Sequence, residues 1–312
     1  MYQKPPGRST RVPQNSGQMC EARLLAPAKV NLYLRIVGRR SDGYHLVDSL
    51  MVPISLFDEV VVRVERCANA RDAGVRLSSD SDAAPGGPAN LAHRAASLFL
   101  TRTGQVATVD IHISKRIPVG SGLGGGSSDG AAVLLALNRL LGRPLGATEL
   151  ARLGGQLGAD VPFFVHGLPA HVRGIGEQVS PVTLPALPWL VVCWDHYSLP
   201  TKLVYARVAL SLTRSAMASN IPPLFSGGRA NPELLINDLE GPAAQIHPEV
   251  LALKSRLIEE GAIGALMSGS GAAVFGMWLD AESAYGAALR LRQRGLWAES
   301  VAVLAASPAA AQ

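Results

Sequence analysis

One segment constrains the fold of this chain more than any other. It reads KRIPVGSGLGGGSSDGAAVLLALNRLLG, from Lys115 to Gly142, and places six glycines between Gly120 and Gly130 directly before an apolar stretch. Glycine is favoured where the backbone takes a positive φ or where another molecule approaches it closely. The free N–H groups and the dipole of a helix N-terminus attract anions. The sequence therefore predicts a phosphate-binding loop that leads into a helix over 127–141.

The loop differs from three common phosphate loops. It lacks G-x-x-x-x-G-K-[ST], so it is not a Walker A loop. Gly120 to Gly125 fits G-x-G-x-x-G, but no second strand ending in an acid follows about 20 residues later, as a dinucleotide-dependent oxidoreductase would need. The V-A-I-K, H-R-D and D-F-G motifs of protein kinases are absent. A plain packing loop fits poorly with three successive glycines followed by Ser127 and Ser128.

Composition narrows the class of protein and its partners. Hydrophobic residues make up 48% of the chain and charged residues 17%, which is typical of a globular protein. The net charge is +5 without a dense Lys/Arg stripe, which favours an anionic small molecule over nucleic acid. The three cysteines form no C-x-x-C motif, which indicates a reducing compartment, so we expect the cytoplasm. The apolar runs are too short to span a bilayer, so no membrane partner is expected.

The distribution of turn residues predicts the domain organisation. Residues 1–20 are rich in Pro, Gly and Ser and read as a flexible extension, residues 21–180 as an N-terminal nucleotide-binding domain, and residues 181–312 as a C-terminal domain. Helices and strands mix without a regular βαβ alternation, which predicts the α+β class. We expect helices over 90–104, 147–158 (capped at Thr148) and 231–240, and a strand over 106–114. A monomer and a homodimer both remain open.

Three motifs, in order, carry a family resemblance. PVGSGLGGGSS resembles the central motif of the GHMP kinases, the family of galactokinase, homoserine kinase and mevalonate kinase. APAKVNLYL resembles the first motif of that family and LMSGSGAAVFG the third, so the likeness covers about residues 24–305. The resemblance implies a two-lobed α+β fold with the active site in the inter-domain cleft. It also implies ATP as phosphoryl donor, with Mg²⁺ arriving on it, and a small alcohol as acceptor.

The resemblance also implies roles for particular residues. Asp160 would act as general base on the accepting hydroxyl, and Lys29 would stabilise the nucleophile. The DGYH and GADVPFF segments resemble those of family members that act on a nucleotide-linked polyol, which implies a substrate of that kind. The substrate side of the site would then consist of Asn31, Tyr44, His45 and Tyr205, with Tyr44 stacked on a cytosine and His45 at its polar edge.

ATP would be bound by the glycine loop, with two further residues near the adenine or ribose. The loop residues are Pro118, Val119, Gly120, Ser121, Gly122, Leu123, Gly124, Gly125, Gly126, Ser127 and Ser128; the two further residues are Asn90 and Lys115. Plainer interpretations stay open: Asn90 as a helix cap, Lys115 as a surface lysine and Tyr205 as a core residue. No metal site made of protein side chains is expected.

Two other functions compete with this hypothesis. A GHMP kinase of the homoserine or mevalonate type would have the same loop, but it would not need the GYH sequence at Gly43–His45. A non-catalytic ATP-binding sensor of the same fold should lack Lys29 or Asp160, and this chain has both.

Overall fold

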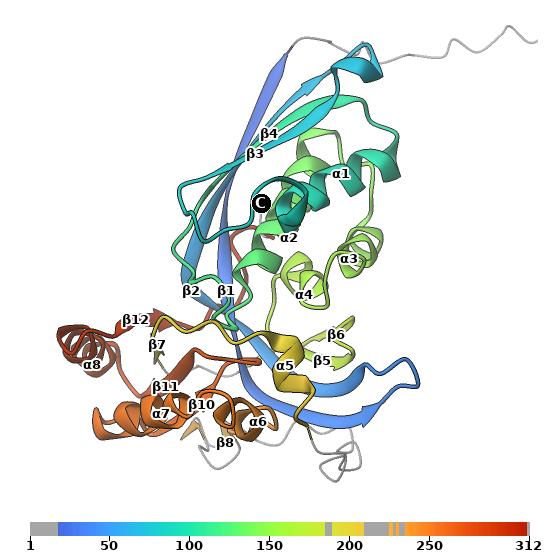
Figure 1. Cartoon of the computed structure of the whole chain (residues 1–312). Coiled ribbons are helices and arrows are strands. Elements are labelled where there is room, and N and C mark those ends of the chain that lie inside the picture. The colour runs from blue at the N-terminus through green and yellow to red at the C-terminus, as the bar shows by residue number, and fades with distance from the viewer. Residues whose placement is uncertain (1–17, 185–188, 209–224, 227–228, 231–234, 311–312) are drawn as a thin grey trace, which may run out of the picture.

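A computed structural model describes residues 18–184, 189–208, 225–226, 229–230 and 235–310 of the chain. Most of the predicted N-terminal extension, residues 1–17, lies outside them. Two separate sheets with helices packed on them form two lobes (Figure 1). Within the described residues, β3 and β4 form the one parallel strand pair and the other pairs are antiparallel. The predicted two-lobed α+β fold is confirmed, and a parallel doubly wound sheet is excluded.

The first sheet has the strand order β3-β4-β2-β5-β6, and β1 pairs with β2. Its strands are β1 (Met19–Arg39), β2 (His45–Arg66), β3 (Gly74–Ser79), β4 (Ala107–Ser114), β5 (Ala170–Gly174) and β6 (Gln178–Pro181). The helices of this lobe are α1 (Leu91–Thr103), α2 (Gly125–Leu140), α3 (Ala147–Gly155) and α4 (Val161–His166), with the short 3-10 turns η1 (Ala70–Asp72) and η2 (Gly87–Ala89). The four α-helices gather beside one face of the sheet, where a continuous hydrophobic core forms (Figure 1).

Local sequence signals account for several of these elements. In β4 every second side chain is buried, as its alternating pattern predicts. Asn90 caps α1, and Gly104 ends it in the left-handed region at φ 64°. The helix predicted after the glycine loop is α2. The predicted cap of α3 at Thr148 is wrong: the cap is Gly146, because the Glu149 side chain accepts the Gly146 N–H from inside the first turn.

The second sheet has the order β10-β11-β7-β12. Its strands are β7 (Trp189–Trp194), β10 (Gly264–Met267), β11 (Val274–Trp278) and β12 (Trp297–Ala302). The helices of this lobe are α5 (Thr201–Tyr205), α6 (Glu240–Ala244), α7 (Glu249–Glu259) and α8 (Ala281–Gln293), and β8 (Phe225–Ser226) pairs with β9 (Arg229–Ala230). The helix predicted over 231–240 is wrong in its described part. Asn237 bridges to Leu34 of β1 instead, and α6 begins only at Glu240.

The two lobes share buried surface. One apolar cluster joins Val30 and Leu50 of the first sheet to Leu190 and Phe275 of the second. Towards its C-terminal end the chain returns to the first lobe, where Ala309 joins the core. Among the helices that the structure describes, none is both long and apolar enough to cross a bilayer.

Candidate active site

A cavity of about 1000 Å³ lies where the two lobes meet, and both lobes line it. The first lobe contributes parts of β1, β2, β5 and the glycine loop, and the second contributes α5 and the turn before β11. Nine of the residues predicted for the site line this cavity together: Lys29, Asn31, Tyr44, His45, Gly122, Gly124, Ser127, Asp160 and Tyr205.

Lys29 and Asp160 meet at this cavity. Nζ of Lys29 lies 3.9 Å from Oδ2 of Asp160, with the lysine side chain 4% exposed and the aspartate 36%. Asp160 precedes α4, yet within the described structure its carboxylate makes no capping hydrogen bond to that helix. Burial lowers the pKa of Lys29, and the Asp160 carboxylate opposes that shift. The pair therefore places an ammonium and an accessible carboxylate side by side.

A short hydrogen-bond relay orients the lysine. Lys29 Nζ donates to Asn31 Oδ1 at 2.7 Å, and Asn31 Nδ2 donates to Ser49 Oγ at 2.8 Å. Ser49 in turn donates to the backbone carbonyl of Tyr33 at 2.6 Å. Because all these groups are buried, the relay restricts the ammonium to one position. Sequence reasoning found Lys29 and Asn31 but missed Ser49, which lies on β2 in a stretch without any motif.

The glycine loop adopts the conformation that its composition requires. Gly120, Gly122 and Gly124 take positive φ values of 73°, 84° and 76°, and α2 begins at Gly125. A Cβ at Gly122 would lie 2.4 Å from the carbonyl oxygen of Ser268. The loop thus packs closely against the turn Ser268–Gly271 of the second lobe. There, Ser268 Oγ donates to the Gly122 carbonyl at 3.3 Å.

The start of α2 offers free polar groups beside the loop. Ser128 is buried, and among the described residues its hydroxyl has no hydrogen-bond partner. A buried hydroxyl without a partner is unfavourable unless a ligand satisfies it. Together with the N-terminus of a helix, it fits a phosphate oxygen or a Mg²⁺ ion carried by a phosphate.

Aromatic groups from both lobes meet at the other end of the cavity. The rings of His45 and Tyr205 lie 5.3 Å apart at an interplanar angle of 37°. Tyr44 beside them is 61% exposed. Burial, and to a lesser extent the charge of Arg39, lowers the pKa of His45, which favours the neutral ring. Tyr205 lines the cavity and also packs against the core of the second lobe, so it is partly a core residue, and its stacking on a base stays a prediction.

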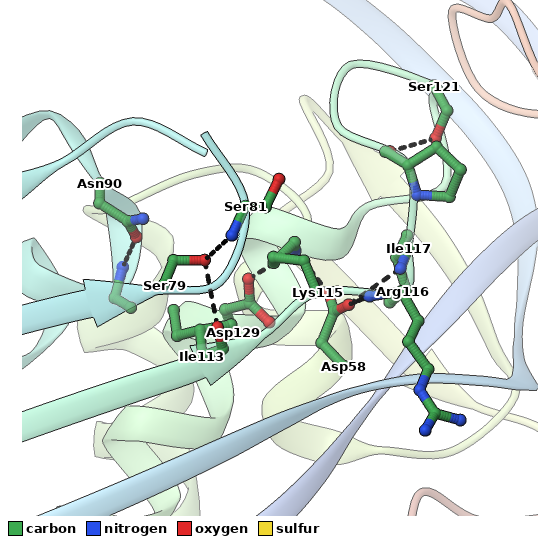
Figure 2. Close-up of polar contacts among 12 residues, drawn as sticks. Asp58, Ser79, Ser81, Asn90, Ile113, Lys115, Arg116, Ile117, Ser121 and Asp129 are labelled. Carbon is green, nitrogen blue, oxygen red and sulfur yellow. Dashed lines mark hydrogen bonds and ion pairs between the residues drawn. The ribbon is translucent and has the colours of Figure 1, made fainter. Parts of the chain in front are cut away.

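Asn90 and Lys115 have partners inside the protein. The Asn90 side chain accepts from Ala92 N, which is the arrangement of a helix cap (Figure 2). It also donates to the Pro85 carbonyl. Lys115 is buried between Asp58 and Asp129, so the interpretation as a surface lysine is wrong. Sequence reasoning missed both aspartates; the Ser-Ser-Asp start of α2 was the signal for Asp129.

Comparison with known proteins agrees with this geometry. Residues 90–168 match the GHMP kinases N terminal domain, and residues 224–295 match the GHMP kinases C terminal domain. A 4-diphosphocytidyl-2-C-methyl-D-erythritol kinase of Geobacter metallireducens is 41% identical over 274 residues, which cover 88% of this chain and 95% of that protein. The kinase of the same name from Syntrophotalea carbinolica is 42% identical over 275 residues, covering 88% and 95%.

Solved structures give the same result. A crystal structure of a 4-(cytidine 5'-diphospho)-2C-methyl-D-erythritol kinase aligns with a TM-score of 0.76 at 41% identity and covers 90% of this chain and 99% of that one. A homoserine kinase from Cytophaga hutchinsonii aligns with a TM-score of 0.68 at 18% identity, covering 96% and 99%. At that identity the second likeness concerns the fold alone.

Proposed function

The chain belongs to the GHMP kinase family and catalyses the reaction of the 4-diphosphocytidyl-2-C-methyl-D-erythritol kinases in the non-mevalonate isoprenoid pathway, and we propose that Lys29 and Asp160 carry that reaction. The γ-phosphoryl group of ATP is transferred to the 2-hydroxyl of the polyol. The observation that carries this assignment is the 3.9 Å contact of the buried lysine with an accessible carboxylate in the cavity between the lobes.

The proposed chemistry is an in-line displacement at the γ-phosphorus. The hydroxyl oxygen forms the new O–P bond while the bond from that phosphorus to ADP breaks, and Asp160 accepts the hydroxyl proton. The Lys29 ammonium lowers the pKa of the hydroxyl and stabilises the negative charge that develops on its oxygen. Phosphoryl transfer needs positioning and charge neutralisation more than covalent catalysis, and the Lys29 ammonium, held by Asn31, supplies positive charge at a defined position.

The glycine loop and the start of α2 are proposed to hold the phosphates of ATP. The N–H groups there, the helix dipole and the Ser128 hydroxyl, which has no partner in the described part of the chain, all favour an anion at this point. Mg²⁺ on the nucleotide supplies charge neutralisation when bound, and Ser128 is the residue that would hold it. Asn90 stays a predicted neighbour of the nucleoside, although its side chain is already engaged as a helix cap.

Cytosine recognition is proposed at the aromatic end of the cavity. Tyr44, His45 and Tyr205 offer flat faces for a pyrimidine, and the neutral His45 ring can both donate and accept a hydrogen bond. This end would distinguish a cytidine-linked polyol from mevalonate or homoserine, which have no base. Cytoplasmic location and a monomeric or homodimeric state stay predictions.

A coupled ADP-release assay tests the proposed function. We expect turnover with the cytidyl substrate and ATP, and none above background with mevalonate or homoserine under the same conditions. Comparable turnover with mevalonate or homoserine would contradict the assignment of the aromatic end to cytosine. No turnover with any of the three alcohols, in a protein that binds ATP by calorimetry, would favour a non-catalytic sensor.

A further inference from the structure

The two ends of the phosphate loop are joined by a buried ion pair. Lys115 lies three residues before Pro118, where the loop begins, and Asp129 of α2 follows Ser128, where the loop ends, so the two residues bracket it. Lys115 Nζ donates to Asp129 Oδ2 at 2.8 Å, and the side chains are 6% and 3% exposed (Figure 2). The 13 residues between them include all five glycines of the loop and form a closed segment with this contact at its base.

Asp58 of β2 binds the same lysine and the start of the loop together. Its Oδ2 accepts from Lys115 Nζ at 2.5 Å, while its Oδ1 accepts the backbone N–H groups of Arg116 and Ile117 at 2.6 and 2.9 Å. Asp58 itself is fully buried. Arg116 and Ile117, which lead into the loop, are therefore fixed to β2 of the first sheet, and the lysine links that attachment to α2 (Figure 2).

The start of α2 packs closely against the charged group of Asp58, Lys115 and Asp129. A Cβ at Gly125 would lie 2.9 Å from the Ile117 side chain and 3.2 Å from Lys115 Nζ. The first residue of α2 is thus packed directly on the group of charges. Removing one partner of a buried charged hydrogen bond leaves the others unsatisfied, and structure nearby rearranges to reach solvent. Here the nearby structure is the loop.

We propose that Asp58, Lys115 and Asp129 form a clasp that holds the two ends of the phosphate loop in the ATP-binding conformation. Their role is positioning, since Lys115 is already engaged by two carboxylates and reaches ATP only through the loop it holds. The proposal rests on the proposed function of the loop as the site of the ATP phosphates. In a clasp, loss of Asp129 should weaken ATP binding. If Lys115 contacted the nucleotide directly, loss of Asp129 should tighten it.

Steady-state kinetics of Lys115→Met, Asp129→Asn and the double variant separate these possibilities. We expect the KM for ATP to rise about tenfold or more in each single variant, the usual effect of losing a hydrogen bond to a charged group. The KM for the cytidyl substrate, measured at saturating ATP, should change less than twofold. Lys115→Met leaves two buried carboxylates facing each other, so adding Asp129→Asn should restore part of the ATP affinity.

Asp110→Asn is the matched control. Asp110 is an exposed carboxylate of β4 that pairs with Arg76, away from the loop, so its loss should leave both KM values unchanged. Hydrogen exchange of the whole protein should show faster exchange at residues 116–128 in the clasp variants and not in the control.

The outcomes separate the clasp from the proposed function. An Asp129→Asn protein that folds and keeps the wild-type KM for ATP would overturn the clasp, as would equal rises in both KM values. If Lys115→Met alone weakens ATP binding while Asp129→Asn tightens it, the lysine contacts ATP directly. If the wild-type protein itself shows no ATP-dependent kinase activity, the proposed function fails first.

Discussion

The rings of His45 and Tyr205 face each other 5.3 Å apart, although His45 begins β2 and Tyr205 ends α5. The first lobe supplies one ring and the second lobe supplies the other. A planar base held here would contact both lobes at once. Substrate binding at this end would therefore also fix the position of α5 relative to the glycine loop, where the phosphates are proposed to bind.

The first prediction concerns the aromatic end. Tyr44→Ala and Tyr205→Ala should each raise the KM for the cytidyl substrate by about 5- to 150-fold, because one base–aromatic stack contributes roughly 1–3 kcal/mol. The KM for ATP should stay nearly constant. Tyr285→Ala, at an exposed tyrosine of α8, serves as the control and should change neither value. An unchanged KM for the cytidyl substrate in both cavity variants would mean that other residues recognise the cytosine.

The sequence predicted the parts of the fold whose signals are local. The alternation in β4, the Asn90 cap of α1 and the glycines before α2 each depend on neighbours within a few residues. The helix predicted over 231–240 failed at its described end because a tertiary contact decided it. Asn237 donates to the carbonyls of Met267 and Gly269 and bridges to β1, which fixes an extended segment there.

The second prediction concerns the shape of the glycine loop. Gly122→Ala should abolish ATP binding, because alanine disfavours φ 84° and its Cβ would lie 2.4 Å from the Ser268 carbonyl oxygen. The matched control is Gly146→Ala before α3, where φ is −71° and no atom lies within 4 Å of the added carbon. Calorimetric titration with ATP measures both. Wild-type affinity in a folded Gly122→Ala protein would mean that the loop is not the phosphate site.

Part of the site was beyond sequence reasoning because it depends on long-range pairing. Asp58 and Lys115 meet only because β2 pairs with β4 in a fixed register, and no motif surrounds Asp58. Ser49 lies beside Asn31 because β1 pairs with β2. By contrast, the roles of Lys29 and Asp160 were predicted through family motifs. Of the two, only Lys29 stands out in its local sequence, as a lysine between Ala28 and Val30 in an apolar stretch.

The third prediction concerns catalysis. Asp160→Asn keeps the size of the side chain but removes the proton acceptor, so kcat should fall by about 10²–10⁴-fold with ATP still bound. Lys29→Met should also lower kcat, because the ammonium acts mainly as charge builds in the transition state. The two losses should be less than additive in the double variant, since both residues act on the same hydroxyl. Strict additivity in this cycle would mean that they act independently.

The last prediction concerns the pH dependence of stability. Burial lowers the pKa of Lys29 below its ordinary value of 10.5, with Asp160 opposing only in part. Below the folded-state pKa, the lysine is charged in both states and its burial destabilises the fold fully. Between that pKa and 10.5 the unfolded chain binds more protons, so wild-type stability rises with pH, by at most ~1.4 kcal/mol per pH unit from this one group.

Lys29→Met removes that dependence. Its side chain also loses the hydrogen bond to Asn31, but this loss gives an offset that does not change with pH. The difference in free energy of unfolding, wild type minus variant, should therefore increase as the pH rises from the folded-state pKa of Lys29 towards 10.5, and it cancels the titration of every unaffected group. Urea unfolding at several pH values measures it. A constant or falling difference would mean that burial does not lower the pKa of Lys29 in the folded protein.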